Sequence, residues 1–212
     1  LSDNVFHEKM DNLHSAIELN YNIIPRSHRA GRWSIDERTF RWLEENNYAV
    51  DSSICPHMTY LRDGNDIESR FGMFSTPFYP DQRDITREAD NPLRRSRILE
   101  VPVTGISGDL LSGFEFRGID RLRNVFSLFG YCGTRPLSFR PSWEIPFRVF
   151  KKVTNRIFES HSDINFMFHS NELTLGTSPY SMTEADVKLI RKKIIYVMQT
   201  AAAYGIRGLK LS

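Results

Sequence analysis

Three short apolar segments of this chain each end in a side chain that can take part in chemistry. The three side chains are Arg29, Asp51 and His169. A strand that is buried along its length and opens onto a cleft at its end has this pattern. A nearby carboxylate raises the pKa of an imidazole, so a histidine at such an edge can serve as an acid near neutral pH.

Further polar and aromatic groups follow directly. Arg32 and Trp33 come after Arg29, and Glu172 comes shortly after His169. Strands that deliver polar groups at their carboxyl ends are typical of a barrel or an open α/β sheet with its site at that rim. Taken alone, however, a histidine at the end of a strand is more commonly structural.

Predicted helices and strands, which must position these groups, alternate along the chain. Helical spacing of apolar residues, together with capping boxes at Ser34/Glu37 and Ser181/Glu184, predicts the helices. Short apolar runs bounded by Pro, Gly or charged residues predict the strands. The helices are expected at 4–21, 34–45, 119–129, 146–160 and 181–205, and the strands at 26–29, 48–50, 98–104, 137–141 and 164–168. This order predicts an α/β fold with a largely parallel sheet.

Composition limits the class of protein. The 212 residues are 40% hydrophobic and 25% charged, which favours a single domain with one sizeable core. The net charge of +2 gives no case for nucleic-acid binding, and the basic run 94–97 is interpreted as a solvated loop. No apolar run is long enough to span a membrane, and no signal peptide precedes Leu1. We therefore expect a cytoplasmic protein.

The segment between residues 51 and 97 has weak periodicity, which is typical of a lid or a binding loop. Its aromatic residues either line a sugar groove or fix the loop to the body of the protein. They are Phe71, Phe74, Phe78 and Tyr79. Cys55 and Cys132 lack the spacing of a zinc site, and the sequence does not decide whether they pair.

Four segments in order resemble the NodB-type polysaccharide deacetylases of carbohydrate esterase family 4, in a branch associated with surface-polysaccharide biosynthesis. The segments are residues 29–33, 48–53, 99–104 and 167–180. The resemblance implies a distorted (β/α) barrel and a hydrolase that removes acetyl groups from N-acetylated sugars. In that family a metal, usually zinc, polarises the amide carbonyl and activates a water molecule. An acetylated carbohydrate is then the expected partner.

The resemblance also implies roles for individual residues. His169 matches the histidine that protonates the leaving amine, and Asp51 matches the acidic residue that keeps that histidine protonated. Arg29 matches the arginine that orients the catalytic base. Arg32, Trp33 and Glu172 are expected to contact the substrate. His28 is left out, because strand alternation turns it away from the face that Arg29 uses.

The chain departs from the family pattern in one respect. The paired aspartates and the two closely spaced histidines that hold the metal do not occur ahead of Arg29. The chain is therefore expected to cover the C-terminal two-thirds of an incomplete deacetylase barrel, with the zinc ligands upstream of Leu1. The alternative is a noncatalytic carbohydrate-binding or scaffold module derived from a deacetylase.

Overall fold

The computed structural model describes residues 2–55, 60–62, 65–67, 76–106, 137–141 and 145–210. The chain divides into two compact units. Unit 1 comprises residues 1–54, 77–102 and 210–212, and unit 2 comprises residues 55–76 and 103–209. The predicted helix at 119–129, the aromatic residues Phe71 and Phe74, and Cys132 lie outside the described residues.

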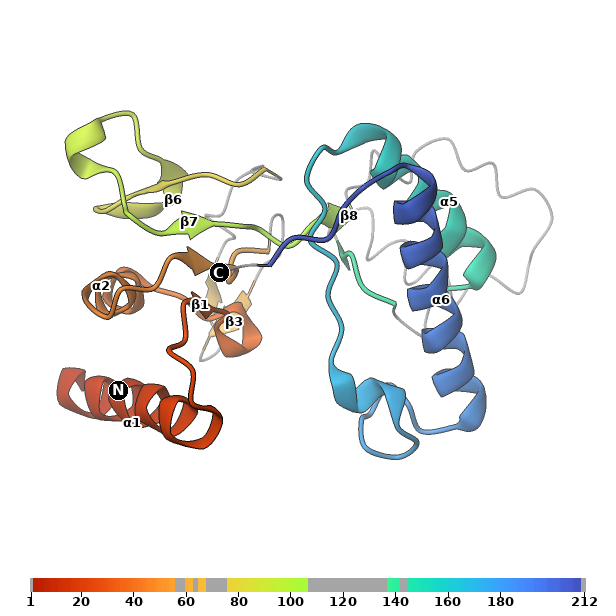
Figure 1. Cartoon of the computed structure of the whole chain (residues 1–212), viewed down its shortest axis with the longest axis horizontal. Coiled ribbons are helices and arrows are strands. Elements are labelled where there is room, and N and C mark those ends of the chain that lie inside the picture. Colours follow the sequence, from red (N-terminus) through yellow and green to blue (C-terminus); the bar gives the residue numbers. More distant parts are fainter. Residues whose placement is uncertain are drawn as a thin grey trace. The chain divides into compact units, whose positions relative to one another are not determined.

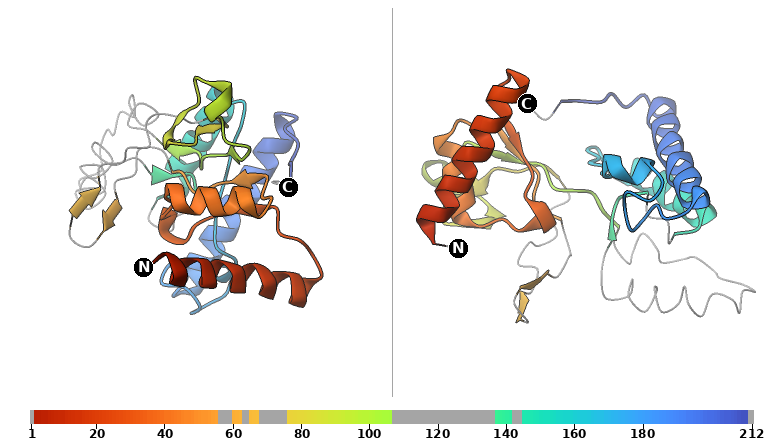
Figure 2. Two further views of the ribbon diagram at one scale, coloured as in Figure 1. Left: turned by 90° about the vertical axis from the view of Figure 1, so that its left-hand side faces the viewer. Right: turned by 90° about the horizontal axis from the view of Figure 1, so that it is seen from below.

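A three-stranded parallel sheet organises unit 1. Its strands β1 (Ser27–His28), β2 (Val50–Asp51) and β7 (Leu99–Glu100) lie in the order β1-β2-β7. Parallel neighbours need a crossover connection, and the helix α2 (Glu37–Glu45) supplies it between β1 and β2. The long helix α1 (Asp3–Tyr21) lies beside α2 (Figures 1 and 2). The expected α/β class and the parallel order of this sheet are confirmed.

Helix α2 begins later than the sequence predicts. Its cap is Asp36, whose Oδ1 accepts hydrogen bonds from the backbone N of Thr39 at 2.8 Å and from the Thr39 hydroxyl at 2.6 Å. The predicted capping box at Ser34 is therefore wrong. Ser34 instead follows the short 3₁₀ helix η1 (Gly31–Trp33).

The weakly periodic segment contains regular structure. In unit 1, β5 (Pro80–Asp81) and β6 (Asp84–Glu88) pair antiparallel, followed by the 3₁₀ helix η2 (Pro92–Arg94). Phe78 is buried, and the guanidinium of Arg95 stacks over the ring of Tyr79 at 3.8 Å. Phe78 is therefore part of the core of unit 1, whereas the Tyr79–Arg95 contact lies within the segment.

The basic run 94–97 makes internal contacts. Arg94 forms ion pairs with Asp81 at 3.5 Å and Asp90 at 2.7 Å. The backbone N of Arg97 donates to the Glu44 carboxylate at 2.9 Å. These contacts join the run 94–97 to Asp81, Asp90 and Glu44 of unit 1.

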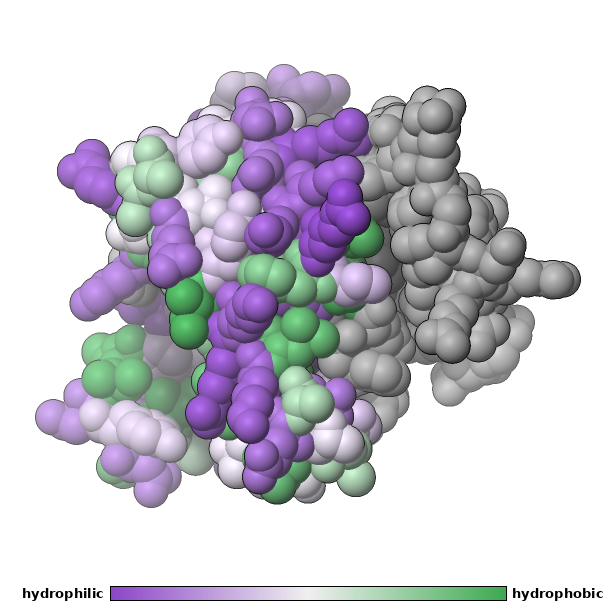
Figure 3. All heavy atoms as spheres, turned by 90° about the vertical axis from the view of Figure 1, so that its right-hand side faces the viewer, coloured by the Kyte–Doolittle hydropathy of each residue, from purple (hydrophilic) through white to green (hydrophobic). Residues whose placement is uncertain are grey.

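Unit 2 is built around helices α5 (Phe147–Ser160) and α6 (Glu184–Ala203), which pack side by side (Figure 1). The pairs β3 (Tyr60–Arg62) with β4 (Asn65–Ile67) and β8 (Gly105–Ile106) with β9 (Leu137–Ser138) are antiparallel. A buried apolar cluster forms the core: Phe139, Phe150, Val153, Ile157, Phe158 and Val197. Hydrophilic side chains cover most of the described surface seen in Figure 3, with small hydrophobic patches between them.

Two sequence predictions in unit 2 are wrong in detail. Residues 164–168 form no regular strand, although Asn165 accepts a hydrogen bond from the backbone N of Thr104 at 3.1 Å and Met167 donates one to Phe139 at 3.2 Å. Helix α6 has its capping box at Thr183 and Asp186, two residues after the predicted one.

The described strands do not close into a barrel. No helix within the described ranges is long and apolar enough to cross a membrane.

Candidate functional site

Three polar side chains form one row across the parallel sheet of unit 1. His28, Asp51 and Glu100 are the last residues of β1, β2 and β7. His28 is in register with Asp51, and Asp51 is in register with Glu100. Residues in register on adjacent parallel strands project to the same side of the sheet. The carboxyl ends of parallel strands are where α/β proteins commonly place their sites.

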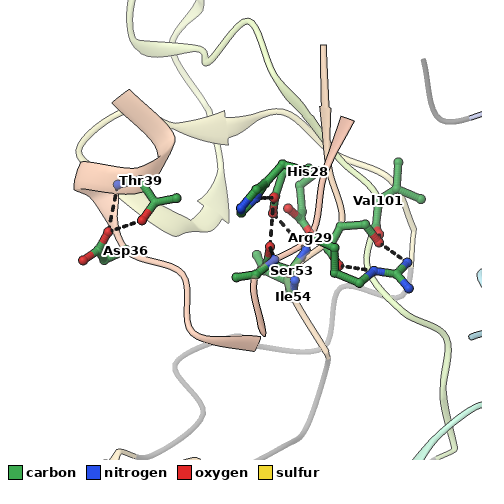
Figure 4. Close-up of polar contacts among 11 residues, drawn as sticks. His28, Arg29, Asp36, Thr39, Ser53, Ile54 and Val101 are labelled. Atoms are coloured by element: carbon green, nitrogen blue, oxygen red, sulfur yellow. Dashed lines mark hydrogen bonds and ion pairs between the residues drawn. The ribbon is translucent and has the colours of Figure 1, made fainter. Parts of the chain in front are cut away.

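Asp51 is fully buried at the centre of this row, with an exposure of 0%. Its Oδ1 accepts hydrogen bonds from Nδ1 of His28 at 2.6 Å and from the hydroxyl of Ser53 at 2.8 Å. Its Oδ2 accepts one from the backbone N of Ser53 at 2.8 Å. Figure 4 shows the contacts that converge between His28 and Ser53. These donors stabilise a buried carboxylate, which is costly without them.

The hydrogen bond to Asp51 fixes the tautomer of His28. An ionised carboxylate only accepts hydrogen bonds, so Nδ1 of His28 carries a proton. Nε2 is then the ring nitrogen that can take up or release a proton, as in sites where a carboxylate orients a catalytic imidazole. The side chain of His28 is 14% exposed.

Glu100 is fully buried on the other side of Asp51. Its Oε1 accepts a hydrogen bond from the backbone N of Ile54 at 3.0 Å. Burial raises the pKa of Glu100 well above its usual range, and the charge of Asp51 and a hydrogen bond with Asp51 raise it further. The Ile54 amide and the charge of Arg29 oppose the shift without cancelling it. Burial and the neighbouring Asp51 charge therefore both favour the protonated form of Glu100.

The raised pKa of Glu100 makes the stability of unit 1 depend on pH. The folded state holds this proton more tightly than the unfolded state does, so the stabilisation is complete below the ordinary glutamate pKa. It is lost as the pH rises towards the folded pKa, at up to about 1.4 kcal/mol per pH unit.

We expect Glu100→Gln, which resembles the protonated acid, to abolish this slope in denaturant titrations across pH. Glu88→Gln, a change at an exposed carboxylate of β6, is the control. An unchanged slope in the Glu100 variant would contradict the assignment.

Arg29 directly follows β1. Its Nε donates to the backbone O of Ser52 at 3.0 Å and its Nη2 donates to the Ser52 hydroxyl at 2.8 Å. The Ser52 hydroxyl in turn donates to the backbone O of Val101 at 2.7 Å. Arg29 is thus fastened to the chain that follows β2, beside the buried row (Figure 4).

Trp33 lies next to Arg29. The Arg29 guanidinium is 5.7 Å from the centroid of the indole ring. Trp33 has a φ of 58°, a left-handed backbone conformation that is uncommon for a bulky residue. Such conformations cluster at ligand-contacting positions. Arg32 belongs to the same 3₁₀ helix η1, and its side chain lies outside the description.

His169 and Glu172 belong to unit 2 and share one turn. His169 is exposed and precedes the 3₁₀ helix η4 (Ser170–Leu173). The backbone N of Glu172 donates to the backbone O of His169 at 2.9 Å. The carboxylate of Glu172 is buried and ion-paired with Arg140. This placement favours an internal role for Glu172 over the predicted contact with substrate.

The structure thus places Arg29 directly after β1 and Asp51 at the end of the adjacent strand β2 in unit 1, and His169 and Glu172 in one turn of unit 2. The convergence of Arg29, Asp51 and His169 at one rim stays a prediction. Sequence reasoning missed His28 and Glu100. Both are polar residues within predicted strands, but the sequence does not state the register that places them beside Asp51.

Within the described ranges, no group of three or more His, Cys, Asp or Glu side chains is placed to hold a metal ion. Comparison of the chain with family models, curated proteins and solved structures finds no match.

Proposed function

We propose that the chain is the proton-transferring part of a hydrolase that removes acetyl groups from N-acetylated sugars, with an incomplete (β/α) barrel of the polysaccharide deacetylase type. One observation carries the proposal: His28, Asp51 and Glu100 are in register at the carboxyl ends of three parallel strands, with the two carboxyl groups buried and Asp51 hydrogen-bonded to His28. Rows of this kind are uncommon without a function, because burying two carboxyl groups side by side is costly.

The chemistry of amide hydrolysis matches this row. A base must take a proton from the attacking water, and an acid must protonate the leaving nitrogen. Asp51 accepts a hydrogen bond from His28 and so orients its imidazole, while Glu100, whose protonated form burial favours, lies on the other side of Asp51. His169, an exposed imidazole, is the proposed general acid.

The proposed sugar contacts lie at η1. An indole ring next to a guanidinium offers a flat apolar face and hydrogen-bond donors, and both suit a sugar ring with polar substituents. Trp33 and Arg29 have this arrangement, and Arg32 lies between them in sequence.

A metal belongs to the proposal only as an expectation from the resemblance. Zinc, when bound, polarises a carbonyl and lowers the pKa of a water molecule. The described residues do not assemble a ligand set for it. The roles given to His28, Asp51 and Glu100 do not depend on it.

The test is release of acetate from oligosaccharides of N-acetylglucosamine, measured with and without a chelator. We expect His28→Gln to reduce kcat by about 10²- to 10⁴-fold, the size of a general acid–base contribution. His7→Gln is the matched control, because His7 is exposed on α1 and its Nδ1 contacts the backbone O of Asp3 at 2.8 Å. Full activity of the His28 variant, or no acetate release by the unaltered protein, would overturn the proposal.

A second candidate function is sugar binding without turnover. The observation that favours it is the pairing of Arg29 with Trp33, which needs no catalytic group. Calorimetric titration with the same oligosaccharides distinguishes the two functions. Binding that Trp33→Ala abolishes, without any acetate release, would identify a binding module.

A further inference from the structure

The turn that carries His169 is held to the core of unit 2 through a buried ion pair. Glu172 is 1% exposed, and its Oε1 accepts a hydrogen bond from Nη2 of Arg140. Arg140 directly follows Phe139, which is fully buried in the apolar core. The backbone N of Glu172 donates to the backbone O of His169, so the carboxylate and the imidazole belong to one rigid turn.

The segment after the turn closes around this ion pair. The Arg140 guanidinium lies 4.6 Å from the centroid of the Tyr180 ring, which covers it on one side. The Thr177 hydroxyl donates to the backbone O of Asn171 at 2.6 Å, and the Ser181 hydroxyl donates to the backbone O of Thr174 at 3.1 Å. The segment from 169 to 181 is therefore folded back on itself over Arg140.

Helix α6 supplies a further attachment. Nη2 of Arg191 donates to the backbone O of Leu173, the last residue of η4, at 2.8 Å. The turn is thus tied at one side to the chain after β9 and at the other to α6. The imidazole of His169 is exposed, so its orientation depends on how firmly the backbone of the turn is held.

We propose that Arg140 and Glu172 are positioning residues, which hold the His169 turn in the geometry that proton transfer requires. The expected effect on the reaction rate rests on the proposed function. The expected effect on the turn rests only on the contacts described above. Removing one partner of a buried ion pair leaves the other charge uncompensated, so the turn opens when either residue is replaced. A misplaced acid lowers the rate of the chemical step without weakening ground-state binding.

The structural part is tested by hydrogen exchange of the amides in residues 170–174. We expect Glu172→Gln and Arg140→Met each to speed this exchange by about a hundredfold, because the turn loses its buried attachment. Arg140→Lys keeps the charge and one donor, so it is expected to restore part of the protection. Glu184→Gln, at a carboxylate that is 76% exposed, is the control. Unchanged exchange in both Glu172→Gln and Arg140→Met would overturn the inference.

The catalytic part is tested by kinetics and by the NMR signals of the His169 imidazole. We expect Glu172→Gln to lower kcat by about a hundredfold while KM changes by less than about threefold. The imidazole signals shift in the same variant and stay in place in Glu184→Gln. Loss of kcat with unshifted imidazole signals would overturn the positioning role.

The two proposals fail separately. If the unaltered protein releases no acetate, the proposed function fails, while the exchange and NMR results still decide whether Arg140 and Glu172 hold the turn. If acetate is released and Glu172→Gln retains full kcat, the positioning role fails and the proposed function stands.

Discussion

Replacing Asp51 with asparagine is expected to reduce acetate release by about 10³- to 10⁴-fold, the loss found when the carboxylate partner of a catalytic histidine is neutralised. The amide has nearly the shape of the carboxylate but can present its NH₂ group to Nδ1 of His28. The imidazole then adopts the other tautomer, and its imidazolium form loses the charge that stabilises it. Steady-state kinetics across pH measure the effect, which falls on kcat more than on KM.

The control for this prediction is Asp163→Asn. Asp163 is an exposed carboxylate in unit 2 that accepts a hydrogen bond from Ser162 at 2.8 Å. Thermal unfolding of both variants separates a lost reaction from a lost fold. Wild-type kcat in a folded Asp51→Asn protein would show that the row of His28, Asp51 and Glu100 is structural.

The second large expected effect concerns Lys193, whose buried side chain makes the free energy of unfolding depend on pH. It lies on α6 with an exposure of 0%, its ammonium donates to the backbone O of Ile145, and it lies 5.2 Å from the centroid of the Phe150 ring. Burial lowers its pKa from 10.5 to about 8. Below pH 8 the folded state carries the whole cost of a buried charge. Between pH 8 and pH 10.5 folding releases the proton, so the free energy of unfolding rises by about 3 kcal/mol.

Denaturant titrations of the wild type and of Lys193→Met between pH 7.5 and pH 10.5 measure this rise. The quantity of interest is the difference between the two curves, because other groups titrate in the same range and cancel. We expect the difference to change by about 3 kcal/mol across the range. Lys188→Met, on the same helix but 78% exposed, is the control. Parallel curves for the wild type and Lys193→Met would show that Lys193 titrates normally.

The elements were predictable from local pattern. Residues 4–21 and 146–160 have helical spacing, and the structure places helices at Asp3–Tyr21 and Phe147–Ser160. The capping residues of the helices were not predictable from local pattern. Several Ser, Thr and Asp side chains precede α2 and α6, and only the folded backbone decides which of them reaches the free N–H groups. Asp36 and Thr183 do so. The run 164–168 has the pattern of a buried strand, but its backbone contacts are divided between Thr104 and Phe139.

The site was predictable only in part, for a similar reason. The structure has Asp51 at the end of β2 and Arg29 directly after β1, close to the predicted strand ends. Strand alternation relates His28 only to Arg29 of its own segment, so it does not show that His28 and Asp51 project to the same side. Glu100 was hidden inside a predicted strand that ran to 104, but the strand ends at Glu100. Which residue of one strand faces which residue of another depends on register, and a single sequence does not state it.

Helix α1 has a consequence for how firmly His28 is held. Phe6 is the only residue of α1 that the structure buries, and polar contacts fasten the helix to α2: Arg38 to Asp3 at 2.9 Å and Trp42 to Asp11 at 2.9 Å. The Tyr48 hydroxyl contacts His14 of this helix, and the Tyr48 ring packs edge-on against His28. Exposed ion pairs weaken as ionic strength rises. We therefore expect salt to weaken the Arg38–Asp3 ion pair that holds α1 to α2. Tyr48, which contacts both His14 of α1 and His28, then loses part of its support, while the buried carboxyl groups of the sheet are unaffected.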